Sequence, residues 1–406
     1  MPYLTNQMKP HAALLLLPLL PLTLLAHDDK VDYDEQTLDV KSMVAEREAS
    51  AVAEPFKGIT TNGEIPAGLF SVKPTGVTTA PLVAAAAAFI ATLTPEQKLH
   101  TVFGVGSPEW RRWCNVDNGI YVRQGTSLRA MNPDQLAAAR QLLQATLSAK
   151  GLALADAIRH TDETLAELNH DRLAYGEDLY YFTVMGLPSP TKPWGWQIDG
   201  HHLVINAFVL GDQVVMTPTF LGGEPVHTRT GKYAGNVILQ DEQNQGLALL
   251  QQFTPEQRAA ATLTPAKLRS SNQAEAFKDN VVIPYAGLPG KAFTPAQRER
   301  LVALIRLFID NQEEGHARVR MEEITARLDD TWFAWIGGAD DDAVFYYRIH
   351  SPVVLIEFDH QAPVGTRMIN EPGKVTREHI HVVIRTPNGN DYGKDLLRQH
   401  LASQPH

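Results

Sequence analysis

The order of helix-like and strand-like segments is the feature that most constrains the fold of this chain. Amphipathic spacing predicts helices, and alternating apolar residues predict strands between and after them. The expected helices cover 79–99, 133–150, 152–169, 254–262 and 294–313, with a short closing helix from about Lys394. The expected strands cover 179–185, a hairpin over 195–219 that turns at Gly211-Asp212, 344–350, 353–359 and 379–386. Such segregated runs favour an α+β fold, with N-terminal and central amphipathic helices packed on an antiparallel sheet and a C-terminal β meander.

A short recurring pattern marks the expected helix starts. Thr at the N-cap can accept from the N3 amide, Gln at N3 can reach back, and Pro at N1 loses no needed donor. The pattern occurs as Thr94-Pro95-Glu96-Gln97, Thr254-Pro255-Glu256-Gln257, Thr294-Pro295-Ala296-Gln297 and Asn132-Pro133-Asp134-Gln135, with Thr264-Pro265 as a shorter fifth case. These sites predict helix boundaries and carry no chemistry.

Length and charge limit the classes of function. The chain has 406 residues, of which 44% are apolar, and can therefore bury a sizeable core. Its formal net charge is −10, from 36 basic and 46 acidic residues. Binding to nucleic acid needs clustered Lys and Arg to neutralise phosphates, and the sequence has no such cluster. We therefore expect no nucleic-acid partner.

The N-terminus has the pattern of a signal peptide. Lys9 precedes an apolar run over 12–25, shorter than the roughly 20 apolar residues of a membrane span. We expect residues 1–26 to be a signal peptide and the protein to be exported, to the periplasm or secreted, with no stable membrane span after cleavage. The alternative is an uncleaved anchor. We expect 27–77 to be a weakly structured leader or linker, and 78–406 to be a single integrated α+β domain.

The single cysteine, Cys114, excludes an internal disulfide. No adjacent base is visible in the sequence, so a buried, inert thiol is expected rather than a nucleophile.

Histidines gather in two strand-rich regions. The first holds His201 and His202, which directly follow Gly200. Neighbouring side chains of a strand point to opposite faces, so both rings can enter one site only if a bulge intervenes, and Gly200 is where such a bulge would fit.

The second region holds His350, Glu357, His379 and His381. His379 and His381 are two residues apart, so they share one face of a strand. If the three C-terminal strands pair as a meander, these four residues converge. Imidazole with carboxylate suits a divalent transition metal, and the sequence therefore predicts a site for zinc, iron or copper formed by some of His201, His202, His350, His379 and His381.

The leading functional hypothesis is a metal-dependent exported enzyme acting on an unidentified small molecule or peptide. Glu357 would be a ligand or general base, and Arg348 or Arg385 would hold an anionic group or stabilise developing negative charge. Hydrolysis is favoured slightly over oxidation, because an imidazole–carboxylate set suits a metal-bound water. The alternatives are a non-enzymatic protein that binds a small molecule or metal, and a structural network of hydrogen-bonded histidines.

Several short motifs together resemble those of one bacterial family. They are Trp194-Gly195-Trp196, Gly200-His201-His202-Leu203 with Asn206, Thr217-Pro218-Thr219-Phe220-Leu221-Gly222, Phe333-Ala334-Trp335-Ile336-Gly337, Tyr346-Tyr347-Arg348-Ile349-His350, Ile356-Glu357-Phe358-Asp359, His379-Ile380-His381 and Gly393-Lys394-Asp395-Leu396-Leu397. The family is the uncharacterised domain of unknown function thirty-five hundred, and the resemblance covers about 78–402. Many members are exported, which the resemblance implies here too. Members often have Asp-Asn where this chain has Asp359-His360. The resemblance implies no reaction, but it makes the histidine-rich segments part of a family pattern.

Overall fold

The computed structural model describes residues 34–403. The expected signal peptide, residues 1–26, lies outside the described residues and stays a prediction. Within the described part, no helix is both long and apolar enough to cross a membrane.

One mixed sheet of thirteen strands runs through the described chain. Its main path is β1-β3-β4-β5-β7-β13-β12-β11-β10-β8, with β2 beside β3, β6 beside β5 and β9 beside β10. The strands are β1 Val102–Phe103, β2 Thr126–Ser127, β3 Tyr180–Met185, β4 Trp194–Gly200, β5 Leu203–Leu210, β6 Gln213–Val215, β7 Thr219–Gly223, β8 Thr262–Thr264, β9 Leu288–Pro289, β10 Trp332–Gly337, β11 Phe345–His350, β12 Leu355–His360 and β13 Ile380–Arg385. The pairs β1–β3 and β8–β10 are parallel, and the long central strands are antiparallel.

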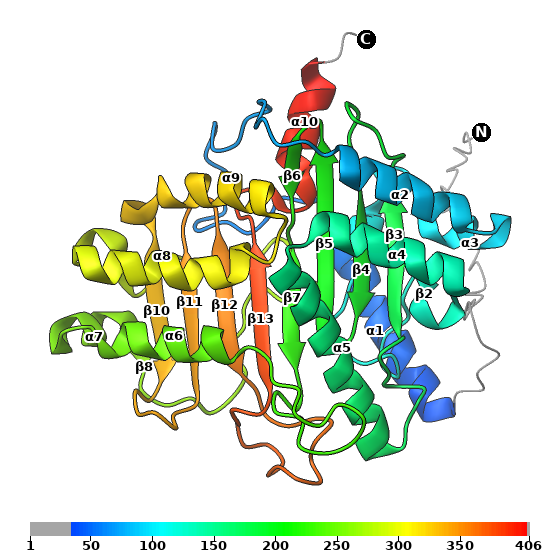
Figure 1. Cartoon of the computed structure of the whole chain (residues 1–406). Helices are drawn as coiled ribbons and strands as arrows, with labels where there is room; N and C mark the ends of the chain where they lie inside the picture. The colour runs from blue at the N-terminus through cyan, green and yellow to red at the C-terminus, as the bar shows by residue number, and fades with distance from the viewer. Residues whose placement is uncertain (1–33, 404–406) are drawn as a thin grey trace, which may run out of the picture. The chain divides into compact units, whose positions relative to one another are not determined.

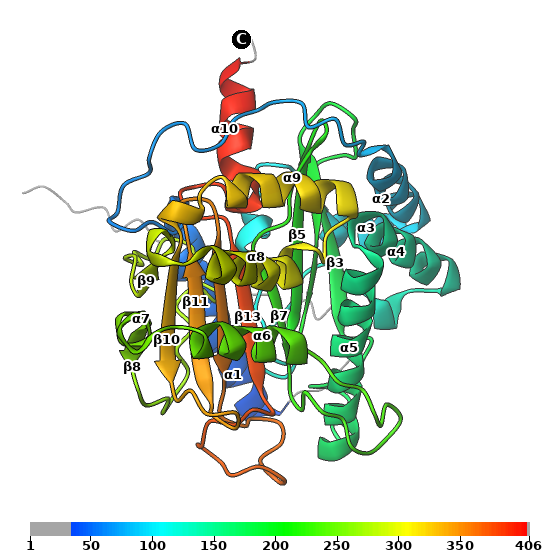
Figure 2. The same ribbon diagram turned by 60° about the vertical axis from the view of Figure 1, so that its left-hand side comes forward.

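Helices flank this sheet, and several of them form a layer over one side (Figures 1 and 2). They are α1 Glu35–Ala53, α2 Ala80–Thr92, α3 Pro95–Thr101, α4 Pro133–Thr146, α5 Ala149–Asn169, α6 Gln240–Gln251, α7 Pro255–Ala261, α8 Pro295–Ile309, α9 Glu314–Thr325 and α10 Lys394–Ser403. Figures 1 and 2 show α4 and α5 over the β3–β5 half, α6 and α8 over the β10–β13 half, and α1 behind the strands. The expected α+β class, C-terminal meander and closing helix are confirmed, and β10 extends the meander by one strand that we did not expect.

The two faces of the meander differ in chemistry. Asp359 pairs with His381 across β12 and β13, and Glu357 lies on the same face. Phe358 and Tyr347 pair on the opposite face, where the Tyr347 hydroxyl donates to a backbone carbonyl of α6 at 2.9 Å. The helix layer therefore covers an aromatic and apolar face, while the face with the polar side chains lies against loops.

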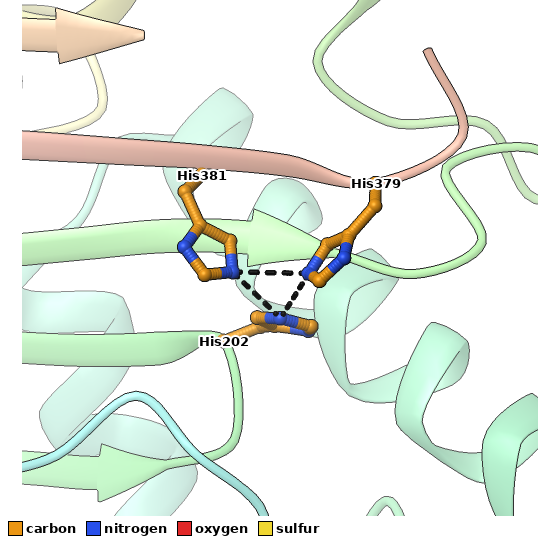
Figure 3. A group of neighbouring side chains, drawn as sticks. All are labelled: His202, His379 and His381. Carbon is orange, nitrogen blue, oxygen red and sulfur yellow. Dashed lines mark hydrogen bonds between the residues drawn. The ribbon is translucent and has the colours of Figure 1, made fainter. Parts of the chain in front are cut away.

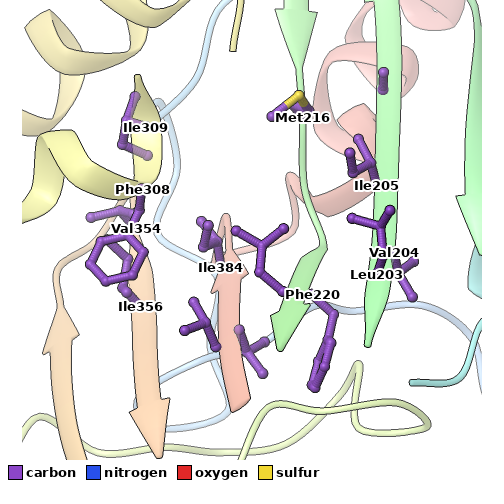
Figure 4. Close-up of a cluster of buried hydrophobic side chains, with 14 of the residues drawn as sticks. Leu203, Val204, Ile205, Met216, Phe220, Phe308, Ile309, Val354, Ile356 and Ile384 are labelled. Atoms are coloured by element: carbon purple, nitrogen blue, oxygen red, sulfur yellow. The ribbon is translucent and has the colours of Figure 1, made fainter. Parts of the chain in front are cut away.

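Apolar side chains close the junction between the two halves of the sheet, where β7 pairs with β13. Burial of such side chains contributes roughly 25 cal/mol per Å² of apolar surface removed from water. Figure 4 shows this cluster, which includes Leu203, Val204, Ile205, Met216, Phe220, Phe308, Ile309, Val354, Ile356 and Ile384.

Four of the five predicted helix starts are confirmed. Thr94, Asn132, Thr254 and Thr294 each form a capping box with the Gln three residues later. The prediction at Thr264 is wrong, because this residue ends β8 and pairs with β10. Its third successor is a lysine rather than a glutamine, so the reciprocal cap is missing.

The predicted hairpin over 195–219 is more divided than expected. The turn at Gly211-Asp212 is present and joins β5 to β6. A second tight turn at His201-His202 joins β4 to β5, where we expected continuous strand. This turn ends the strand alternation on which the interpretation of the two histidines relied.

Residues 27–77 contain a helix, α1, where we expected weak structure. Asp34 caps it by accepting from a first-turn amide at 2.8 Å. Lys41 is buried and donates to the Tyr121 carbonyl at 3.3 Å, and the Tyr121 hydroxyl donates to buried Glu48. The expectation is wrong for this stretch because polar contacts from distant sequence hold the helix, and local composition does not reveal them.

Candidate metal centre

Three histidines from distant parts of the sequence meet beside the central strands. His202 lies in the turn between β4 and β5, His379 directly precedes β13, and His381 lies within β13. Strand β7 separates β5 from β13 and is in register with both, since it pairs with Leu203 on one side and places Gly222 opposite His381 on the other. This strand order brings the turn next to the start of β13.

The Nε2 atoms of the three rings point at one another (Figure 3). They are 3.2 Å apart between His202 and His379, 3.0 Å between His379 and His381, and 3.2 Å between His381 and His202. Imidazole nitrogens that share a tetrahedral zinc ion, each at about 2.0–2.1 Å, are separated by about 3.3 Å. Within residues 34–403, this is the group of histidine, cysteine or acidic side chains with the spacing to hold a metal ion.

The outer nitrogens of two of these rings are already used. Nδ1 of His379 lies 2.8 Å from the Ala362 carbonyl oxygen, and Nδ1 of His381 lies 2.9 Å from Oε1 of Glu275. Both partners are acceptors, so each Nδ1 carries the ring proton and each Nε2 presents a lone pair. Two lone pairs that face each other at 3.0 Å repel unless a cation lies between them. A metal ion between the two nitrogens would remove this repulsion, whereas hydrogen bonding between neutral histidines would not.

Burial keeps the rings of His202 and His379 neutral. It lowers the pKa of His202 well below its usual value, and the neighbouring histidines lower it further. Burial also lowers the pKa of His379 to about 4, against the opposing effect of the Glu224 carboxylate. Neutral imidazole is the form that binds a metal, so both rings are ready to bind one near pH 7.

Glu224 connects His379 to the loop that follows β12. Its Oε2 lies 3.4 Å from Nδ1 of His379, and its carboxylate accepts from the amides of Val364, Gly365 and Thr366 at 2.9–3.1 Å. Although burial raises the pKa of Glu224, His379 and these hydrogen bonds lower it overall. The ionised carboxylate of Glu224 thus lies beside Nδ1 of His379, on the side of the ring away from the other two histidines.

The carboxylates of β12 hold the loop that carries Glu275. Glu357 accepts from the backbone amides of 273–274 at 3.0 and 2.9 Å, and Asp359 accepts from the amide of Ser271 at 2.7 Å. Hydrogen-bonded carboxylates behind a ligating histidine fix its tautomer and orientation. Glu357 and Asp359 therefore contribute indirectly. They fix the backbone of the loop that carries Glu275, and Glu275 contacts His381.

The family described as Protein of unknown function (DUF3500) matches residues 75–394. The chain belongs to this family. The matched region contains the three histidines together with Glu224 and Glu275, and the predicted resemblance is confirmed. No curated protein and no solved structure matches the chain. The description of the DUF3500 family assigns no activity.

In this DUF3500 protein, His201 stands behind the three-histidine group. Its Nδ1 lies 2.6 Å from Oδ1 of Asp162, and its ring stacks on that of His202 with the centroids 3.9 Å apart. His202 has a φ of 59°, in the left-handed region. The turn thus brings the two neighbouring rings together as a stack, without a bulge at Gly200.

The structure does not bring His350 to the group. His350 lies on the same face of the sheet as His381. However, it pairs with Leu355 of β12, which in turn pairs with Arg385 of β13, four residues beyond His381. The ring packs on Tyr285 with centroids 4.7 Å apart, and neither of its nitrogens has a hydrogen-bond partner. Burial, helped by nearby Arg348, lowers the pKa of His350 to about 3.

The residues expected to carry catalysis have other partners. Arg385 is fully buried and contacts Asp391 at 2.7 Å and Asp279 at 2.6 Å, besides a backbone carbonyl. Arg348 donates to a loop carbonyl at 3.2 Å. Both carboxylate oxygens of Glu357 accept hydrogen bonds, from backbone amides and from a tyrosine hydroxyl. These side chains hold the loops around the DUF3500 site.

Sequence reasoning missed the supporting residues Asp162, Glu224 and Glu275. Each lies in a helix or loop far in sequence from the histidine that it contacts. The one available signal was at Glu224, which follows the family motif ending at Gly222 by two residues.

Proposed function

We propose that this protein is a metal-dependent hydrolase in which His202, His379 and His381 hold one divalent ion of the zinc type. The observation that carries the proposal is the convergence of three Nε2 atoms at 3.0–3.2 Å, two of them with their proton fixed on the far nitrogen. Three protein ligands leave a coordination position for water or substrate, whereas a structural zinc site has four protein ligands.

The donor set supports hydrolysis over oxidation. Iron oxygenases of the facial-triad type use a carboxylate ligand, and blue-copper sites use a cysteine thiolate. Here Glu224 and Glu275 contact the outer Nδ1 atoms rather than the side facing the ion. Cys114 is buried, and burial raises the pKa of its thiol to about 12.

The chemistry of such a centre is the activation of water. A zinc ion lowers the pKa of bound water to about 7 and so supplies a hydroxide nucleophile near neutral pH. The protein's own residues keep the rings oriented, and burial keeps His202 and His379 neutral. Glu275, with 22% of its side chain exposed, and His381, with 11%, form the more open side of the group, from which we expect substrate to approach.

Two measurements on purified protein examine the proposal. After reconstitution with zinc, we expect about one equivalent of bound metal and metal-dependent cleavage of at least one of p-nitrophenyl acetate, p-nitrophenyl phosphate and casein. The double variant His379→Ala/His381→Ala should lose both the metal and the cleavage while keeping its circular dichroism spectrum. His400→Ala, in the closing helix, is the matched control and should keep both. Stoichiometric metal without any turnover would refute the hydrolase and leave a metal-binding protein.

A further inference from the structure

A cleft of about 750 Å³ lies beyond the C-terminal end of β13. Its size is within the roughly 300–1,000 Å³ of small-molecule sites. His381 and Arg385 are four residues apart on β13, so at about 3.3 Å per residue the strand alone separates the cleft from the histidines by about 13 Å. The walls come from 56–57, 65–70, 106–108 with Arg111, 388–389 and the first turns of α10.

The charged residues that line the cleft are mostly basic. Four are basic and one is acidic: Lys57, Arg111, Lys394, Arg398 and Asp395. Arg111 is paired with Asp279 at 2.7 Å, and Arg398 is paired with Asp395. Within residues 34–403, the amines of Lys57 and Lys394 make no hydrogen bond or ion pair. The cleft therefore has uncompensated positive charge.

Lys394 is the member of its family motif that the fold does not explain. Gly393 has a φ of 61° and a neighbouring ring 2.0 Å from where a Cβ would lie, so it needs to be glycine. Leu396 and Leu397 are buried, and Asp395 forms an ion pair within α10. Lys394 is half-buried, and its amine makes no hydrogen bond or ion pair with the described part of the chain. Burial together with Arg111 lowers its pKa to about 8, against the opposing effect of the Asp279 carboxylate. A partly desolvated cation of this kind gains from a bound anion.

The remaining lining is largely apolar. Phe56, Leu69, Phe70 and Pro108 lie along the same cleft, and the side chain of Phe70 is buried. An apolar wall beside unpaired amines is the arrangement that recognises a ligand with an anionic head and an apolar body.

We propose that this cleft binds a small organic acid, with its anionic group on Lys394 and its apolar body against Phe56, Leu69 and Phe70. The site shares no residue with the metal centre. Part of its wall, residues 56–70, precedes the region matched by the family, which begins at residue 75. The proposal therefore does not rest on the hydrolase.

Two fluorescent probes distinguish the contribution of the anionic head to binding from that of the apolar body. 8-Anilinonaphthalene-1-sulfonate carries an anionic group, and N-phenyl-1-naphthylamine is its uncharged counterpart. We expect saturable binding of the sulfonate with one site per chain. Loss of a charged hydrogen-bond partner should weaken sulfonate binding about 10-fold in Lys394→Met, while binding of the neutral probe stays within about 2-fold.

Three further variants complete the design. Lys394→Arg should retain sulfonate affinity, Leu69→Ser should weaken both probes, and Lys192→Met, an exposed lysine elsewhere, should change neither. Circular dichroism and bound zinc should be the same in all of them. Equal sulfonate affinity in the wild type and Lys394→Met, or no saturable binding in the wild type, would overturn the proposal.

Discussion

The Oε1 atom of Glu275 lies 2.9 Å from Nδ1 of His381, and this contact decides which nitrogen of His381 faces the other two rings. Although burial raises the pKa of Glu275, the hydrogen bond from His381 is the strongest of the effects that bring it down to about 2. The carboxylate is therefore ionised at neutral pH and makes the ring a stronger donor to a metal ion.

Removal of the Glu275 carboxylate should weaken metal binding without removing a ligand. We expect Glu275→Ala to lower zinc affinity by about 10- to 100-fold, the usual effect of losing such a supporting group. Glu275→Gln should recover part of the loss, because its amide oxygen can still accept from Nδ1. Competition with a chromophoric chelator measures the affinities. Glu371→Ala, an exposed glutamate, is the control, and equal affinity in Glu275→Ala and this control would refute the role of Glu275.

Arg385 should prove to be structural. Arg385→Met leaves Asp279 and Asp391 buried without their shared cation, and breaking a buried pair in this way costs about 3–5 kcal/mol in the free energy of unfolding. Arg398→Met breaks an ion pair whose arginine is exposed and should cost about 0–1 kcal/mol. Guanidinium denaturation compares the two variants. A stable Arg385→Met protein that has lost only substrate binding would favour the catalytic role that the sequence suggested.

Substitution of His350 should not lower the free energy of unfolding, in contrast to substitution of Arg385. Both of its nitrogens are buried without partners, so His350→Leu removes no hydrogen bond and should leave stability at pH 7 unchanged or raise it by about 1–3 kcal/mol. In the unfolded chain this histidine takes up a proton near pH 6.5, but in the folded chain only near pH 3.

Between these two values the unfolded chain binds more protons, so the His350 contribution destabilises the wild type increasingly as the pH falls from about 6.5 towards 3. The advantage of His350→Leu should therefore grow by up to about 1.4 kcal/mol per pH unit below 6.5. Urea denaturation at pH 7.5 and pH 5 measures it. A variant that is less stable at both pH values would show that the imidazole has a favourable partner.

Local spacing was enough to predict parts of this molecule. The four helix starts depend on residues three positions apart, and His379 and His381 share a face because they are two apart in a strand. His202 could not be placed, because its contact with His379 spans 177 residues and depends on β7 pairing between β5 and β13.

His350 shows the limit of reasoning about strand faces. The predicted face was right, but the position of His350 along the sheet depends on the register of three strands. This register places His350 in one row with Leu355 and Arg385, away from His381. The supporting carboxylates come from α5 and from loops, whose course the strand pattern does not determine.

X-ray absorption at the zinc edge of the full chain, reconstituted with one equivalent of zinc, tests the central claim most directly. We predict three imidazole nitrogens at about 2.0–2.1 Å with the outer scattering of imidazole rings, and a reduction of this scattering by about one ring in His202→Ala. A spectrum without imidazole scattering, or with a sulfur ligand at about 2.3 Å from Cys114, would contradict a centre formed by His202, His379 and His381.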